Sequence, residues 1–163
     1  MYSSSELDGQ SKPSFYAMLV QEAEALLTGE HDRVANAANF AALVWQHVPS
    51  INWCGFYFFD GQELVVGPFQ GRPACVRIAL RQGVCGIAAA TLETQLVVDV
   101  HAVPGHIVCD ATSRSELVVP LRYDDGRLLG VWDVDAPVPG RFDAEDRQGM
   151  EKLLGVFLAS LRY

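Results

Sequence analysis

Residues 116–135 read ELVVPLRYDDGRLLGVWDVD, in which two apolar runs flank the turn sequence DDG at 124–126. A short turn of this composition between apolar runs is typical of a β-hairpin. Successive side chains of a strand point to opposite faces, so Asp133 and Asp135 point to the same face. The predicted strands cover 116–122 and 127–135, and the second of them carries two carboxylates on one face.

The segments on either side of this hairpin predict further elements. Apolar residues recur at the helical period from Pro13 to Gly29 and again over 31–48. Asp143 followed by Asp146 resembles a capping box and predicts a last helix that starts there. Strands are predicted at 52–59, 62–66, 75–80 and 95–98, and a helix of small residues at 83–92.

This order has no strict alternation of strands and helices, which argues for an α+β domain. The expected arrangement is a central antiparallel sheet with helices packed on one face and a loop-covered ligand pocket on the other. The same order fits the GAF and PAS-like sensor folds, an analogy that carries no function by itself. We expect a loose N-terminal tail over residues 1–12 and a single folded domain over 13–163.

Composition excludes several functional classes. The chain has 163 residues, half of them hydrophobic, and a net charge of −8, so it can bury a core as one domain. No run of basic residues could neutralise the phosphates of a nucleic acid. No segment has the 18 or so apolar residues needed to span a bilayer, and the N-terminus lacks the pattern of a signal peptide. We expect a cytoplasmic protein.

The four cysteines suggest thiol chemistry rather than a disulfide scaffold. Cys109 lies in a long polar loop over 99–113, where an accessible thiolate could act as a nucleophile; the alternative is a small buried side chain. Cys75 and Cys85, each more often an inert core residue, could resolve a thiol that oxidises during turnover. Cys54 alternates with Trp53 on a strand, so we assign it to packing on the opposite face.

A zinc site would need ligands from His101, His106 and Cys109, together with Cys75 or Cys85. These spacings do not fit the paired-ligand pattern of structural zinc sites. We therefore expect no metal, and we expect the two histidines to form hydrogen bonds in their loop.

The acidic residues of the hairpin are more informative. Two like charges side by side on a buried face are costly, so the alternative is that Asp133 and Asp135 face solvent. Glu116 interrupts the start of the other strand in the same way, and Trp53 could add an aromatic wall. If these side chains line one cavity, it is suited to a ligand with an ammonium group and to a protonated carboxyl donor.

Several segments together resemble a known family. They are NWCGFYFF (52–59), GPFQG (67–71) with the cysteine that follows it, GVCG (83–86), HIVCDATSRSELVVP (106–120) and LLGVWDVDAP (128–137). In these motifs and their spacing the chain resembles the free methionine-(R)-sulfoxide reductases, enzymes built on a GAF fold, over about residues 14–160. Two departures are Cys54, where a small residue such as Ala is expected, and Trp132, where Leu is expected.

The resemblance implies a mechanism and a set of roles. Cys109 would attack the sulfoxide sulfur, which releases methionine and leaves a sulfenic acid. Cys75 would condense with it to a disulfide, Cys85 would be a third thiol active in recycling, and thioredoxin would reduce the disulfide. Four residues would form the substrate pocket: Trp53, Glu116, Asp133 and Asp135.

The resemblance further implies a homodimer that needs no metal or organic cofactor. A carboxylic acid with a raised pKa is what the protonation of a sulfoxide oxygen requires, so the residues and the resemblance agree. The alternative from another class is a GAF module that binds a small molecule, or senses oxidants through its thiols, without turnover.

Overall fold

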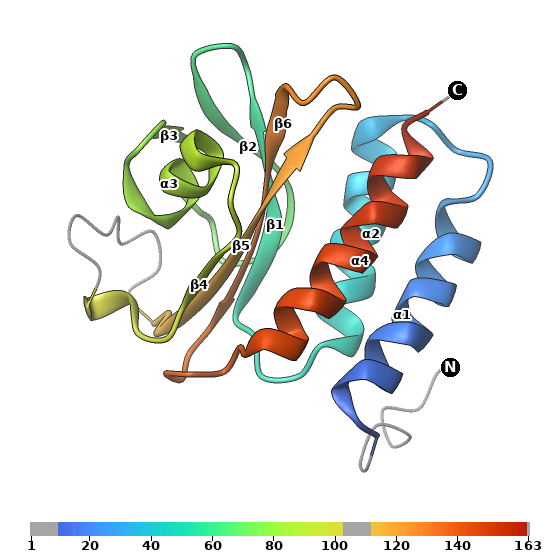
Figure 1. The fold of residues 1–163 in the computed structure, drawn as a ribbon, viewed down its shortest axis with the longest axis horizontal. Coiled ribbons are helices and arrows are strands. Elements are labelled where there is room, and N and C mark those ends of the chain that lie inside the picture. Colours follow the sequence, from blue (N-terminus) through green and yellow to red (C-terminus); the bar gives the residue numbers. More distant parts are fainter. Residues whose placement is uncertain (1–9, 103–111, 163) are drawn as a thin grey trace.

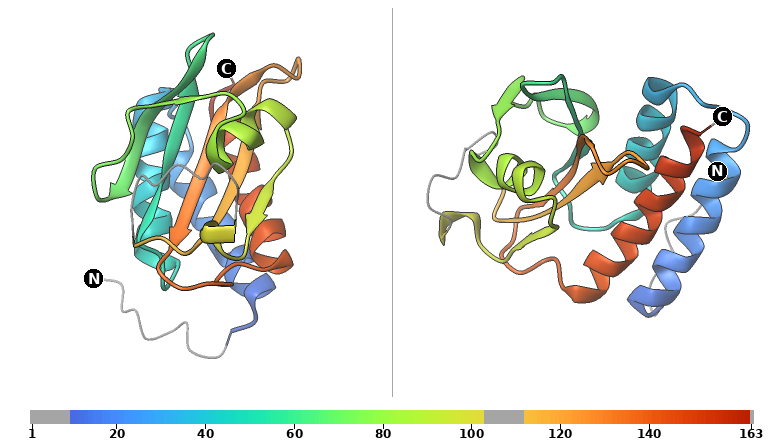
Figure 2. Two further views of the ribbon diagram at one scale, coloured as in Figure 1. Left: turned by 90° about the vertical axis from the view of Figure 1, so that its left-hand side faces the viewer. Right: turned by 45° about the horizontal axis from the view of Figure 1, so that its top comes forward.

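The computed structural model describes residues 10–102 and 112–162. Three helices cover one face of a six-stranded sheet: α1 (Lys12–Leu27), α2 (Arg33–His47) and α4 (Ala144–Ser160) (Figure 1). α2 and α4 contact the sheet, and α1 packs on α4 and α2 as an outer layer. α3 (Gly83–Thr91) lies across the opposite face, as the left view of Figure 2 shows.

The sheet is antiparallel throughout, with the strand order β3-β2-β1-β6-β5-β4. Its strands are β1 (Trp53–Phe59), β2 (Glu63–Gly71), β3 (Arg77–Ala79), β4 (Gln95–Val97), β5 (Ser115–Arg122) and β6 (Leu128–Ala136). A short 3-10 helix (Val100–Ala102) follows β4. The predicted α+β class with a GAF-like single-domain arrangement, and the predicted hairpin at 116–135, are confirmed.

The largest differences from the expected strand bounds are in β2 and β3. β2 continues to Gly71 instead of ending at residue 66, because Pro68, which lacks an N–H, falls in a bulge where β1 and β2 change register between Gly55 and Tyr57. β3 is confined to Arg77–Ala79 within the predicted 75–80.

The helix termini follow the sequence closely. The capping box of Asp143 and Asp146 predicted for α4 is present. α1 already begins at Lys12, within the stretch expected to be a tail, and the Lys12 ammonium lies 2.6 Å from the buried Asp146 carboxylate. Residues 1–9 of the expected tail lie outside the described residues. Within the described ranges, no helix combines the length and the apolar character needed to cross a bilayer.

Each face of the sheet has its own apolar core. Cys54 and Trp132 are buried in the core under the helices, where the Trp132 ring packs edge-on against Phe40 and Phe56. Trp53 belongs to the core on the α3 side. The prediction that Cys54 packs on the face opposite Trp53 is therefore confirmed, and both departures from the family pattern, Cys54 and Trp132, face away from the α3 side.

Candidate active site

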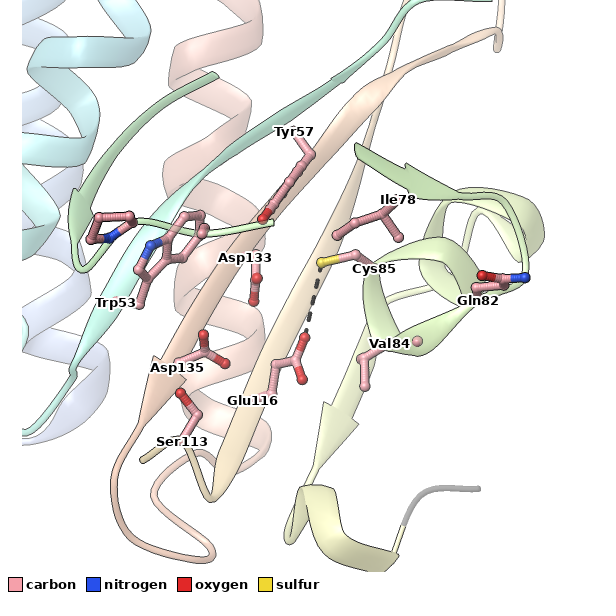
Figure 3. A pocket seen from close by; sticks show the side chains of 13 residues that line it. Trp53, Tyr57, Ile78, Gln82, Val84, Cys85, Ser113, Glu116, Asp133 and Asp135 are labelled. Atoms are coloured by element: carbon pink, nitrogen blue, oxygen red, sulfur yellow. Dashed lines mark hydrogen bonds between the residues drawn. The ribbon is translucent and has the colours of Figure 1, made fainter. Parts of the chain in front are cut away.

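A pocket opens between α3 and the sheet, and its floor is made by β1, β5 and β6 (Figure 3). It brings together five residues that the sequence singled out: Trp53, Cys85, Glu116, Asp133 and Asp135. Cys109 and His106 lie outside the described residues. The described lining includes no Lys, Arg or His, so its formal charge comes from carboxylates.

The strand register explains why these side chains meet. Trp53 pairs with Asp135, and Asp135 pairs on its other side with Glu116, which makes one row across three strands. Asp133 lies in the next row of the same face, between Gly55 and Val118. The prediction that both aspartates share one face is confirmed, and the alternative that they face solvent is wrong for Asp133, which is 7% exposed.

The inner carboxyl groups are buried at the end of the pocket nearest α3. Glu116 is 6% exposed, and its Oε1 accepts a hydrogen bond from the Cys85 thiol at 3.9 Å (Figure 3). The Oδ1 atom of Asp133 is buried and has no hydrogen-bond partner among the described residues. A buried carboxylate oxygen without a donor is costly, so this atom is available to a ligand.

Burial sets the protonation of this cluster. Loss of solvent raises the pKa of Glu116 well above its usual range, and the charges of Asp133 and Asp135 raise it further. Burial also raises the pKa of Asp133, to about 7, although the neighbouring Cys85 and Glu116 side chains oppose the shift. The two carboxyl groups titrate as a pair, so the pair keeps a proton to higher pH than an exposed carboxyl group would and can donate it.

The Cys85 thiol is neutral in this setting. Burial is the main cause that raises its pKa well above the usual value, and Asp133 and Glu116 add to the shift. Cys85 is held there by α3, whose N-terminus borders the pocket at Gln82, Gly83 and Val84. No side chain of the described residues caps this helix, so its first amides and the positive end of its dipole are available to an anionic group.

Trp53 forms a fixed aromatic wall. Its indole N–H donates to the Arg72 carbonyl at 3.1 Å, and its ring stacks on Phe69 and Tyr57 with centroids 5.3 Å and 5.9 Å away. Gly55 leaves room for this ring, because a Cβ there would lie 2.3 Å from Phe69 and 2.8 Å from the indole. The wall is therefore built before a ligand arrives.

The cysteines of the described residues differ in their oxidation state. Cys75 is disulfide-bonded, whereas Cys54 and Cys85 are free thiols. The Tyr57 hydroxyl donates to the Cys75 carbonyl at 3.1 Å, and Ala74 lines the pocket, so Cys75 lies beside its wall.

Of the residues weighed from the sequence as zinc ligands, Cys85 belongs to the cluster that the fold brings together within the described ranges. His101 is exposed, with Nδ1 3.9 Å from Asp99, and does not line the pocket. The His, Cys and acidic side chains that do converge within the described ranges are Cys85, Glu116 and Asp133, whose ligand atoms lie within 4.8 Å of one another.

Several lining residues could not be found from sequence, notably Tyr57, Ile78, Gln82 and Ser113. Tyr57 lies an even number of residues after Trp53 and therefore on the same face of the strand, which was the one sign in the sequence that it could line the pocket. The others reach the pocket through the packing of α3 and of the loop ends, which no local pattern specifies.

Because the Asp133 carboxyl group is buried, we expect its ionisation to lower the stability of the fold at a site that the function needs. The folded-state pKa of Asp133 is raised, so the native state loses stability as pH increases from about 4 to about 7, by about 1.4 kcal/mol per pKa unit. Asp133→Asn should therefore raise the free energy of unfolding at pH 8 by about 2 kcal/mol or more, and much less at pH 4. Urea unfolding at the two pH values measures this difference.

The matched control is Glu24→Gln, which removes one charge from an exposed position on α1. An Asp133→Asn variant that is less stable than the wild type at pH 8, with Glu24→Gln unchanged, would contradict the assignment of a strained buried charge.

Comparisons with known proteins place these features in a family context. A family model described as the GAF domain matches residues 33–156. The free methionine-R-sulfoxide reductase of Escherichia coli is 46% identical over 144 residues, which cover 88% of this chain and 87% of that protein.

Two solved structures are similar to this chain over nearly all of its length. The free methionine-R-sulfoxide reductase of Neisseria meningitidis in complex with its substrate is 39% identical, with a TM-score of 0.88, over 94% of this chain and 92% of that one. A crystal structure from Burkholderia vietnamiensis, described as a candidate GAF sensor protein, is 61% identical, with a TM-score of 0.91, over 94% of this chain and 100% of that one.

Proposed function

The chain belongs to the free methionine-R-sulfoxide reductase family of GAF domains and is an oxidoreductase, and on that premise we propose that it reduces free L-methionine (R)-S-oxide to methionine in the pocket beside α3. The observation that carries the proposal is the pocket itself, with three carboxyl groups, a fixed indole wall and no basic residue in its described lining. A ligand with an ammonium group and a polarised oxygen complements this set of side chains.

The substrate is a zwitterion, and the pocket offers a partner for each end. Asp135, which pairs with Trp53 across β1 and β6, would accept the α-ammonium group. The uncapped N-terminus of α3 at Gly83 would hold the carboxylate. Trp53 would contact the methyl end of the side chain, which leaves the sulfoxide oxygen directed to Glu116.

The proposed chemistry begins with attack of the Cys109 thiolate on the sulfoxide sulfur. Glu116, whose pKa burial raises, gives a proton to the sulfoxide oxygen, and the resulting hydroxyl group passes to the Cys109 sulfur as the transient bond between the two sulfurs breaks. The products are methionine and a sulfenic acid on Cys109. The Cys75 thiol then displaces water from the sulfenic acid to form a disulfide, and thioredoxin returns both thiols by exchange.

The state of the cysteines supports this sequence of steps. Cys75 is disulfide-bonded while Cys54 and Cys85 are free, and Cys109 is the remaining cysteine of the sequence. Cys85 would take part in recycling as a third thiol. Its raised pKa makes its thiolate scarce at neutral pH, so we expect this exchange to be slower than direct attack of thioredoxin on the disulfide.

Replacement of the resolving thiol should separate the two half-reactions. Cys75→Ser should still release one methionine per chain in a single turnover, because Cys109 is intact, yet fail to turn over with thioredoxin, because no exchangeable disulfide forms. The measurement is methionine released per chain with and without the thioredoxin system. Cys54→Ala, on the opposite sheet face, is the matched control and should turn over normally. Undiminished turnover of Cys75→Ser with thioredoxin would transfer the resolving role to Cys85.

Substrate selectivity tests the ammonium contact. Neutralising one partner of a partly buried ion pair costs roughly 3–5 kcal/mol, so kcat/KM for N-acetyl-methionine (R)-sulfoxide should be lower by about a hundred-fold or more. Asp135→Asn should harm reduction of the free amino acid far more than that of the acetylated compound, which has no ammonium group to lose. Similar kcat/KM values for both compounds with the wild-type protein would refute the proposed contact.

The resemblance also extends the proposal to the domain organisation, the oligomeric state and the location of the enzyme. We expect one catalytic domain over residues 13–163, assembled as a homodimer. Thioredoxin recycling needs a reducing compartment, which supports a cytoplasmic location.

A further inference from the structure

We propose that the inner end of the pocket binds a thiophilic divalent cation of the zinc type through Cys85 Sγ, Glu116 and Asp133. The ligand atoms of these three side chains lie within 4.8 Å of one another, and all three residues are more than nine-tenths buried. The Asp133 Oδ1 atom lacks any hydrogen-bond partner among the described residues. A sulfur atom and two carboxylates, one of which has an unsatisfied oxygen, together form a three-membered donor set for such an ion.

The geometry fits a cation with little rearrangement. In tetrahedral geometry, zinc bonds of about 2.3 Å to sulfur and about 2.0–2.2 Å to oxygen place two ligand atoms about 3.3–3.7 Å apart. The three ligand atoms lie within 4.8 Å of one another, and Cys85 Sγ lies 3.9 Å from Glu116 Oε1, so side-chain rotation can bring them to these separations. Three protein ligands leave a fourth position open to water on the pocket side, as in zinc sites that are not fully enclosed.

Electrostatics favours a cation over the empty cluster. Asp135 also lies on this face of β6, and Tyr57 from β1 lines the same pocket. No described lining residue brings a positive charge. A divalent ion would relieve the repulsion among the carboxylates and offset part of their desolvation.

The ion would compete with the protons that the proposed reduction needs. A zinc-bound thiol and zinc-bound carboxylates are deprotonated, so the ion would displace the proton from Glu116. The bound form would therefore lack the acid required at the sulfoxide oxygen. This consequence rests on the proposed function, whereas cation binding itself does not.

Cobalt(II) provides a probe that reports the sulfur ligand directly. In the oxidised protein Cys75 is in its disulfide, and the free thiols of the described residues are Cys54 and Cys85. Untagged oxidised protein titrated with cobalt chloride at pH 8 should develop the near-ultraviolet thiolate-to-cobalt band, saturate at one ion per chain, and lose the band when zinc is added. The affinity should be lower by about ten-fold or more at pH 6, because protons compete for the ligands.

Variants assign the ligands. Cys85→Ala should show no band, while Cys54→Ala, buried on the other face, should match the wild type. Asp133→Asn, which is expected to fold at least as stably as the wild type, should weaken cobalt binding by about ten-fold or more. Absence of a band in the wild type, or a band that persists in Cys85→Ala, would overturn the site. The readout needs no turnover, so failure of the proposed reductase activity would leave it unaffected.

Discussion

Cys109→Ser is expected to abolish methionine formation, even with an excess of dithiothreitol. The reaction needs a nucleophile that is ionised at neutral pH and can then carry the oxygen as a sulfenic acid. A serine hydroxyl does neither, since it has no comparable anion near pH 7 and forms no reducible oxygen adduct. Methionine released from the free sulfoxide, measured by amino-acid analysis, gives the result directly.

The control for this variant is Cys54→Ala, because Cys54 is a free cysteine buried among the helices and far from any proposed step. It should retain nearly wild-type activity. Residual activity of Cys109→Ser above about a tenth of the wild type would contradict the assignment of Cys109 as the nucleophile. A loss of activity in Cys54→Ala as large as in Cys109→Ser would show that the substitutions disturb the fold rather than remove a reactive thiol.

The second large effect is expected for Glu116→Gln. Glutamine keeps the size and the hydrogen-bonding capacity of the protonated acid but has no proton to give, so kcat should fall by about 10²–10⁴-fold. KM should change much less, because the proposed contacts to the two charged ends of the substrate remain. Steady-state kinetics with the free sulfoxide separates the two parameters.

The pH profile gives an independent check of the same residue. Burial raises the pKa values of Glu116 and Asp133, so the wild-type kcat should decline on the alkaline side as the cluster loses its protons. Glu116→Gln should lose this alkaline limb. Glu24→Gln, exposed on α1, is the matched control and should preserve both the rate and the profile. A wild-type rate that rises steadily through this range would argue against a carboxylic acid as the proton donor.

The part of the site carried by strands could be predicted because strand parity is a local property. Asp133 and Asp135 had to share a face, and Cys54 had to oppose Trp53, whatever the rest of the fold did. The same argument predicted the hairpin, since turn residues and apolar runs are both local.

The part that depends on packing between distant segments could not be predicted. The contact of Cys85 with Glu116 joins residues 31 positions apart through the placement of α3 on the sheet. The extension of β2 through Pro68 depends on a bulge against β1, which the sequence of the segment does not specify. The convergence of a thiol with two carboxyl groups likewise follows from α3, which explains why the sequence directed the metal question to the histidines instead.

The central claim is catalytic reduction of one particular sulfoxide, and the most direct measurement is methionine formation from the separated diastereomers of free methionine sulfoxide with thioredoxin as reductant. The predicted result is repeated turnover of the (R)-sulfoxide, with the (S)-sulfoxide and peptide-bound sulfoxide as poor substrates. Binding of the free sulfoxide without methionine formation, or equal turnover of both diastereomers, would contradict the account and favour a GAF module that binds a small molecule or senses oxidants.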